Sequence, residues 1–248
     1  MADYDNRVMR GARSAEAGLI DAGLRAHMLS VYNYMLVGLA LTGATAWLTA
    51  STQLSTLFYH VDAASGRFGM TMLGWIALFA PLGLVMLMSF RINSMSVSAA
   101  RATFFVYAGL VGIGIAPILW VYTGASVAET FFVTAATFGA MSLWGYTTRS
   151  DLSGMGSFLF MGLIGLVIAS LVNMFFHSSM MQWVISVLGV LIFTGLTAFD
   201  TQAIKENYST NDDGTVGGRK AIFGALKLYL DFLNLFLFLL RFLGDQRR

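Results

Sequence analysis

Two aspartates near the end of the chain are the residues best suited to chemistry. Asp200 lies in "LTAFDTQAIKE" and Asp231 in "LYLDFLNLFLFLLR", both within strongly apolar surroundings. An acidic side chain at the centre of a membrane helix costs at least about 2.5–3.5 kcal/mol, so such residues usually face a bundle interior or a water cavity and mark function. Asp200 and Asp231 are therefore candidate sites for binding protons or cations.

The elements that must position these acids are membrane helices. The chain is 57% hydrophobic and 11% charged, whereas soluble domains carry about 25% charged residues. A helix needs about 20 apolar residues to cross the hydrocarbon layer, and long continuous runs favour helices over barrel strands of alternating polarity. We predict an all-α polytopic membrane protein with seven transmembrane helices. The expected spans are 31–50, 70–90, 103–122, 126–146, 154–176, 183–204 and 221–244.

Domain organisation and orientation follow from polar stretches and basic residues. We expect an N-terminal tail over 1–30, a helical domain over 31–244 with a polar loop at 206–220, and a short tail over 245–248. The tail lacks the apolar stretch of a signal peptide. Lys and Arg concentrate in alternate loops, which predicts a cytoplasmic N-terminus. Seven crossings place the C-terminus outside despite Arg247 and Arg248; a re-entrant last helix is the alternative.

Several other functions are disfavoured by the residues present. The absence of cysteine excludes disulfides and thiolate metal sites, and the histidines lack neighbouring ligands at helical spacing. The glycines of the third span lack the preceding strand of a nucleotide loop, and the polar loop lacks the ligand pattern of an EF-hand. We therefore expect no cofactor and no nucleic-acid partner. The histidines are His27, His60 and His177; the glycines are Gly109, Gly112 and Gly114; and the acids of the polar loop are Asp212 and Asp213.

The two aspartates are expected at one depth on neighbouring antiparallel helices. Asp200 lies about seven residues before the end of its helix near Asn207, and Asp231 about seven residues after a start near Gly224. Two carboxylates close together in a low dielectric cannot both ionise cheaply, so the pair is expected to share a proton and titrate as a unit. This predicts a proton sensor.

Neighbouring polar residues leave the environment of the pair open. Lys227 lies four residues before Asp231 and can form an ion pair with it, whereas Asn234 presents an amide to the same helix face and favours a polar pocket. Asp200 can alternatively lie at a solvated helix end and reach Lys205. Arg91, at the cytoplasmic end of the second span, is a candidate latch that binds the charged form of the pair.

A third acid has a simpler interpretation. Glu129 lies only a few residues into the fourth span, next to the short loop that precedes it. A side chain at that depth can reach the membrane surface, so we expect an interfacial position.

The C-terminal part of the chain resembles a known family. "FDTQAIK" followed by "ALKLYLDFLNLFLFLLRFLG", with "YTTRSDLSGMG" after the fourth span, is similar to the Bax inhibitor-1 family in its bacterial branch. The resemblance implies six helices around a central last helix and a pH-sensitive calcium leak. It also implies that the sensing pair corresponds to Asp200 and Asp231 and that an arginine latch corresponds, by position, to Arg91.

Three functions therefore compete. The first is a cation leak channel gated by the aspartate pair. The second, reported within the resembling family, is a non-conducting modulator of membrane proteases or other membrane complexes. The third is an intramembrane aspartyl protease, in which two aspartates share a proton and activate water. Such proteases carry Tyr-Asp and Gly-x-Gly-Asp, whereas Phe199 precedes Asp200 and Leu230 precedes Asp231. We expect a protein without enzymatic activity.

Overall fold

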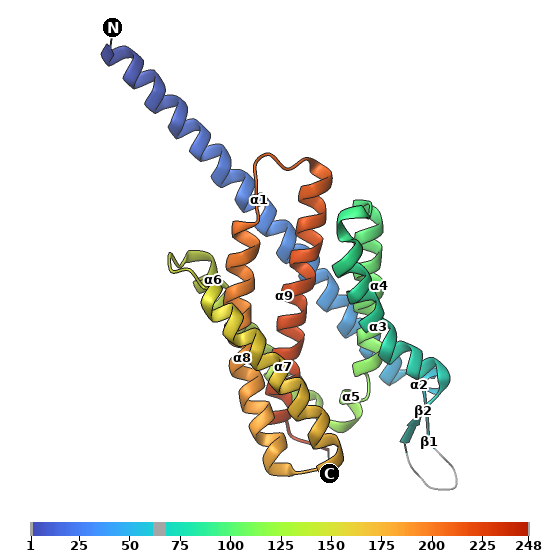
Figure 1. Ribbon diagram of the computed structural model, residues 1–248. Helices are drawn as coiled ribbons and strands as arrows, with labels where there is room; N and C mark the ends of the chain where they lie inside the picture. Colours follow the sequence, from blue (N-terminus) through green and yellow to red (C-terminus); the bar gives the residue numbers. More distant parts are fainter. Residues whose placement is uncertain (1, 62–67, 248) are drawn as a thin grey trace.

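The computed structural model describes the backbone of residues 2–61 and 68–247 and the side chains of 22–60 and 69–247. Nearly all of this chain is helical, and the two termini lie at opposite ends of a helical bundle (Figure 1). The elements are α1 (Ala2–Ser51), α2 (Ser55–Phe58), β1 (Tyr59–Val61), β2 (Phe68–Met70), α3 (Met72–Arg91), the 3-10 helix η1 (Ile92–Ser94), α4 (Val97–Ile115), α5 (Ile118–Val121), α6 (Gly124–Thr147), α7 (Ser153–Phe176), α8 (Ser179–Glu206) and α9 (Gly214–Leu243).

The membrane-spanning elements match the predicted number. Among the described residues, seven helices are long and apolar enough to cross a membrane, which confirms the all-α polytopic class. Polar residues mark where five of them begin, because each N-cap side chain accepts a hydrogen bond from a backbone N–H of the first turn. These N-cap residues are Thr71, Ser96, Thr123, Ser178 and Asp213.

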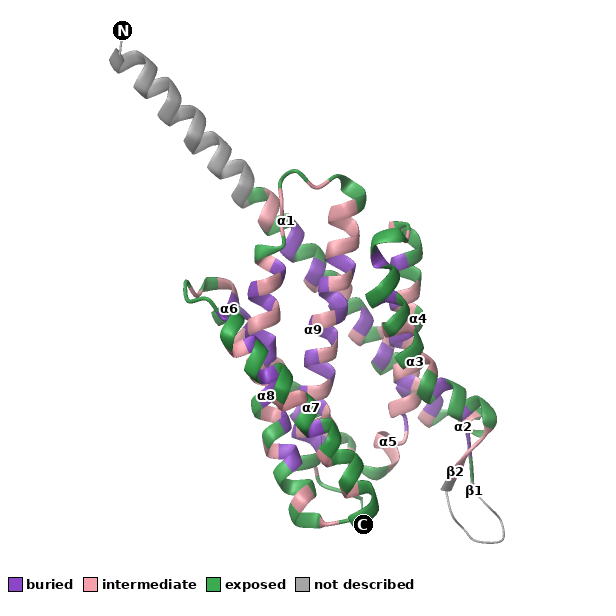
Figure 2. Cartoon of the chain, in the orientation of Figure 1, coloured by how far each residue is buried: buried purple, intermediate pink, exposed green. Residues whose placement is uncertain are grey.

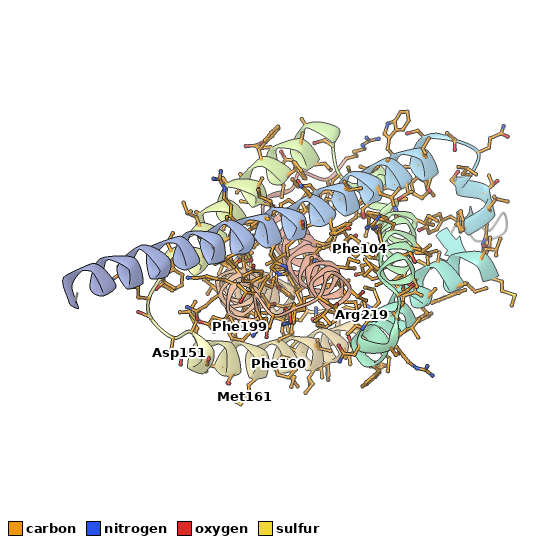
Figure 3. All side chains as sticks on the ribbon, turned by 90° about the horizontal axis from the view of Figure 1, so that it is seen from above. Phe104, Asp151, Phe160, Met161, Phe199 and Arg219 are labelled. Atoms are coloured by element: carbon orange, nitrogen blue, oxygen red, sulfur yellow. The ribbon has the colours of Figure 1, made fainter. Side chains whose placement is uncertain are left out.

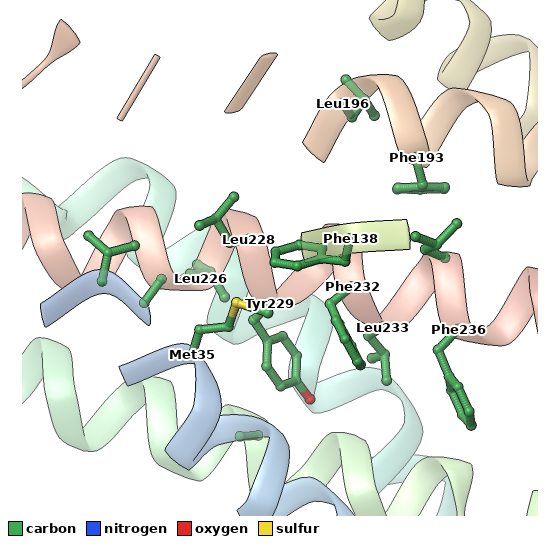
Figure 4. Close-up of a cluster of buried hydrophobic side chains, with 14 of the residues drawn as sticks. Met35, Phe138, Phe193, Leu196, Leu226, Leu228, Tyr229, Phe232, Leu233 and Phe236 are labelled. Carbon is green, nitrogen blue, oxygen red and sulfur yellow. The ribbon is translucent and has the colours of Figure 1, made fainter. Parts of the chain in front are cut away.

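The last helix occupies the centre of the bundle, as predicted. Within the most apolar 18-residue stretch of α9, 67% is buried inside the protein, whereas the corresponding share for α7 is 6%. Helix α9 packs against α8, α1, α6 and α4, whereas α7 lies at the periphery and is largely exposed (Figure 2). The buried cluster along α9 includes Tyr229, Phe232 and Phe236, which meet Met35 from α1 and Phe138 from α6 (Figure 4).

Small residues allow two pairs of helices to approach closely. A Cβ atom on Gly145 of α6 would collide with the carbonyl oxygen of Ala198 on α8. A Cβ atom on Gly112 of α4 would collide with Thr45 and with the Thr42 carbonyl of α1. Close backbone approach at small residues is how membrane helices gain packing contacts. These crossings hold α8 and α1 in fixed positions beside α9.

Three boundaries differ from the sequence prediction. The predicted loop 206–220 is wrong in length, because α9 begins at Gly214 after Asp213 caps it by accepting hydrogen bonds from the N–H groups of Thr215 and Val216 at 2.8 and 2.7 Å. Helix α1 begins at Ala2, so it runs through the predicted tail 1–30 into the first span. The third span breaks near Pro117, which ends one helix and caps α5.

The last helix is long enough to cross fully. Its 30 residues extend about 45 Å at 1.5 Å per residue. With the termini at opposite ends (Figure 1), the structure favours seven complete crossings over a re-entrant last helix. A short antiparallel hairpin, β1 with β2, joins the first two long helices outside the spans and pairs Tyr59 with Met70.

Candidate functional site

The two candidate aspartates meet at the packed interface of α8 and α9. Their carboxyl groups lie near each other, close enough for their charges to interact. Asp231 is 4% exposed, and the Asp200 side chain is 14% exposed. A hydrogen bond between two carboxyl groups needs one proton, since an ionised carboxylate only accepts. The arrangement therefore suits a pair that holds a proton between its members.

Lys227 supplies the positive charge of this site, with a different partner from the one expected. Its Nζ atom donates to Asp200 Oδ1 at 3.1 Å, across the interface to α8. The ion pair predicted with Asp231, one turn along the same helix, is therefore replaced by an interhelical one. Lys227 also lies 6.0 Å from the ring centre of Phe223. One ammonium thus faces two carboxyls, and Asp231 Oδ2 has no hydrogen-bonding partner among the described protein groups.

Two other predicted site residues lie apart from the pair. Asn234 Nδ2 donates to the Leu230 carbonyl of its own helix at 2.8 Å, so its amide caps a backbone group. Arg91 lies exposed at the end of α3. Among the residues described, no ion pair joins Arg91 to either aspartate. Its role as a latch stays a prediction.

The described residues do not assemble a fixed metal site around the pair. Calcium takes six to eight oxygen ligands. In the described part of the chain, no group of three or more His, Cys, Asp or Glu side chains is placed to hold a metal ion. Calcium contact at Asp200 and Asp231 stays a prediction.

Hydroxyl and amide groups next to Asp200 tie α8 to its neighbours. Thr201 is hydrogen-bonded to Ser142 of α6 at 3.0 Å, and Ser142 in turn to Tyr32 of α1. Gln202 accepts from the Leu152 N–H at 2.8 Å and donates to the Ser150 carbonyl at 2.9 Å, at the start of α7. These side chains fix the α8 segment that carries Asp200. Sequence reasoning missed them, because hydroxyl groups are common in membrane helices and most bond their own backbone.

Tyr229 fixes the rotation of α9 two residues before Asp231. The ring is fully buried, and its hydroxyl group lies 2.6 Å from Thr42 Oγ1 on α1. Thr42 Oγ1 also lies 2.9 Å from each of the backbone carbonyls of Gly38 and Ala108, which share its single O–H donor. The polar end of Tyr229 is therefore anchored to both α1 and α4. Because side chains 229 and 231 project from different sides of a helix, this anchor holds Asp231 toward α8.

The remaining polar candidates are separate from this site. Lys205 donates to the Tyr146 carbonyl at 2.8 Å, so the predicted contact between Asp200 and Lys205 does not form. Glu129 is exposed near the start of α6, in keeping with the predicted interfacial position. His27 is buried and stacks obliquely on Tyr208, with 5.6 Å between ring centres.

Comparisons with known proteins agree on one family. Residues 24–248 match the family described as "Inhibitor of apoptosis-promoting Bax1". Protein RP147 of Rickettsia prowazekii (strain Madrid E) is 47% identical over 247 residues and is covered, like this chain, over its whole length. Inner membrane protein YbhL of Escherichia coli (strain K12) is 45% identical over 231 residues, 91% of this chain and 94% of YbhL. A membrane protein of Streptococcus pyogenes, SpyM3_0260, is 37% identical over 90% of the chain and 94% of that relative. The chain belongs to the Bax inhibitor-1 family of membrane proteins.

Proposed function

We propose that this protein is a proton-sensitive cation leak of a bacterial inner membrane, with Asp200 and Asp231 as its switch. The observation that carries the proposal is the meeting of two carboxyls and one ammonium, Lys227, at the buried α8–α9 interface. Inner-membrane placement is supported by the name of the relative YbhL. Intramembrane ionisable groups that pair with one another commonly mark ion pathways or proton relays.

The direction of the switch follows from the charges. With one shared proton, the pair carries a single negative charge, which Lys227 balances through its contact with Asp200. A second proton neutralises the pair, so Lys227 loses its charged partner and the charged contact between α8 and α9 disappears. We expect this to loosen the two helices and to raise the leak as the pH falls. Calcium is the cation that the family resemblance suggests.

Arg91 has a secondary place in this proposal. It lies at the end of α3, and the positive-inside pattern assigns that end to the cytoplasm. In the closed arrangement Lys227 already neutralises the pair. The predicted latch role of Arg91 therefore requires a movement that brings α3 closer to α8 and α9.

Calcium entry into dye-loaded vesicles tests the proposal. Wild type and the variants Asp200→Asn, Asp231→Asn and Arg91→Ala are reconstituted and compared across a range of pH. We expect a leak in wild type that rises with acidity, with this pH dependence lost in both Asn variants. Arg91→Ala is expected to raise the resting leak if the latch operates.

Glu206→Gln serves as the matched control, because Glu206 is an exposed carboxylate at the end of the same helix. It should keep the wild-type pH dependence. A wild-type flux no greater than that of empty vesicles would refute the leak and favour a non-conducting modulator of membrane proteases. Cleavage of a helical substrate that is lost in both Asn variants would favour the protease.

A further inference from the structure

Arg219, on the first turns of α9, has an incompletely satisfied guanidinium. Its Nη1 atom donates to the Asn93 carbonyl of η1 at 2.7 Å. Its Nε atom is buried, and no protein group in the described part of the chain accepts its hydrogen. Figure 3 shows Arg219 in a view down the bundle, on the side of α9 toward α3. Burying an N–H of a charged group without an acceptor is costly, so this donor is available to a ligand.

A cavity of about 310 Å³ lies next to this guanidinium, where the end of α3 meets the start of α9. Its lining includes neutral polar side chains as well as apolar ones. The lining residues used here are Ser89, Ile92, Asn93, Arg219 and Phe223. The cavity therefore combines the Arg219 guanidinium with neutral hydrogen-bonding groups and apolar side chains.

The charges around the cavity favour an anion. Lys220 also borders it, but its Nζ atom already contacts Asp212 Oδ2 at 2.6 Å and the Asn207 carbonyl at 2.8 Å. Within the described ranges, no carboxylate forms an ion pair with Arg219. The Asp212 charge is thus balanced by Lys220, and the Arg219 charge is left to an external partner.

We propose that this cavity binds a phosphate group, held by two parallel hydrogen bonds from the Arg219 guanidinium. Arginine presents a planar fork that matches the oxygens of phosphate, and such bidentate contacts are the strong, specific ones. Nε with one Nη forms one edge of that fork, and the Nε donor is the unpaired one. The phosphate can come from an anionic lipid headgroup or from a soluble phosphate, since the cavity lies at the ends of the spans.

The position of the cavity gives the bound group a structural consequence. It bridges η1 and α9 beside the existing contact from Arg219 to Asn93. Phe223 in its wall is the ring that Lys227 approaches. A bound phosphate therefore stabilises the junction of α3 and α9 one turn from the residue that pairs with Asp200. This binding site does not depend on whether the protein conducts ions.

Thermal unfolding of the purified full-length protein tests the proposal in two arms. The first adds inorganic phosphate against sodium chloride of equal ionic strength, in neutral detergent. The second compares nanodiscs of phosphatidylcholine with nanodiscs containing phosphatidylglycerol. We expect the unfolding midpoint to rise in at least one arm. The responding arm identifies the source, a soluble phosphate in the first and a lipid headgroup in the second.

Three variants decide whether the cavity is responsible. Arg219→Gln should weaken the apparent affinity by at least about tenfold, because it removes charge-assisted hydrogen bonds. Arg149→Gln removes an equal charge from an exposed loop and should respond like wild type. Ser89→Leu puts a larger side chain into the cavity lining and leaves Arg219 intact, so it keeps the test valid if Arg219→Gln fails to fold. No response of wild type in either arm, or a wild-type response in Ser89→Leu, would overturn the proposal.

Discussion

Removing the ammonium of Lys227 should destabilise the protein by a measurable amount. In Lys227→Met the carboxylate of Asp200 loses its partner at 3.1 Å, next to the 4% exposed Asp231. Breaking a fully buried pair costs about 3–5 kcal/mol, whereas exposed pairs contribute at most about 1 kcal/mol. The side chains of Lys227 and Asp200 are 37% and 14% exposed, so solvent screens one end of the contact. We expect a loss of about 1–3 kcal/mol, between these limits.

The measurement is the free energy of unfolding in mixed micelles, in a double-mutant cycle with Asp200→Asn. Because Asp200→Asn removes the unpaired charge, the double variant should recover part of the stability that Lys227→Met loses. The coupling energy should therefore differ clearly from zero, as it does for residues in contact. Additive effects, with a loss below about 0.5 kcal/mol for Lys227→Met, would refute the inferred ion pair.

Two further predictions concern the scaffold and one loop. Gly145→Ala should destabilise the protein by about 1–3 kcal/mol, because its new Cβ would strike the Ala198 carbonyl; Gly139→Ala, where a Cβ meets open space, should be neutral or stabilising in the same unfolding assay. The pKa of the Asp151 carboxyl is lowered mainly by a hydrogen bond from the Ser153 side chain, and further by one from the Ser153 backbone. The stabilisation by this carboxylate is therefore complete above the ordinary Asp pKa of about 4 and is lost as the pH falls through the lowered value. In acid unfolding, Asp151→Asn should lack the loss of stability that protonation of Asp151 causes in wild type. An acid-unfolding profile identical to that of wild type would contradict this prediction.

The helices could be predicted because membrane insertion depends on local composition. Runs of about 20 apolar residues must be helical in lipid, and the seven runs in the sequence correspond to seven helices. The equal-depth argument for the aspartate pair assumed that the last helix starts near Gly224, whereas α9 begins at Gly214; the two acids nevertheless lie near each other across α8 and α9. The start of α9 was placed too late, since the polar residues after Asp213 form helical turns outside the apolar run.

Side-chain partners between helices could not be predicted in the same way. Lys227 stands at a spacing that allows a contact with Asp231, yet it pairs with Asp200 because α8 lies against that face of α9. The anchor of Tyr229 on Thr42 joins residues 187 positions apart. Such contacts depend on the rotation and neighbours of each helix, which one sequence does not specify.

The shared proton of the aspartate pair is tested most directly by infrared difference spectroscopy of the protein in nanodiscs. A protonated carboxylic acid has a C=O stretching band that a carboxylate lacks. We predict such a band in wild type at neutral pH and its loss in Asp231→Asn, because Asp200 then keeps its ion pair with Lys227 and has no second carboxyl with which to share a proton. A wild-type spectrum without the band, or a band that persists unchanged in Asp231→Asn, would contradict the proposed switch.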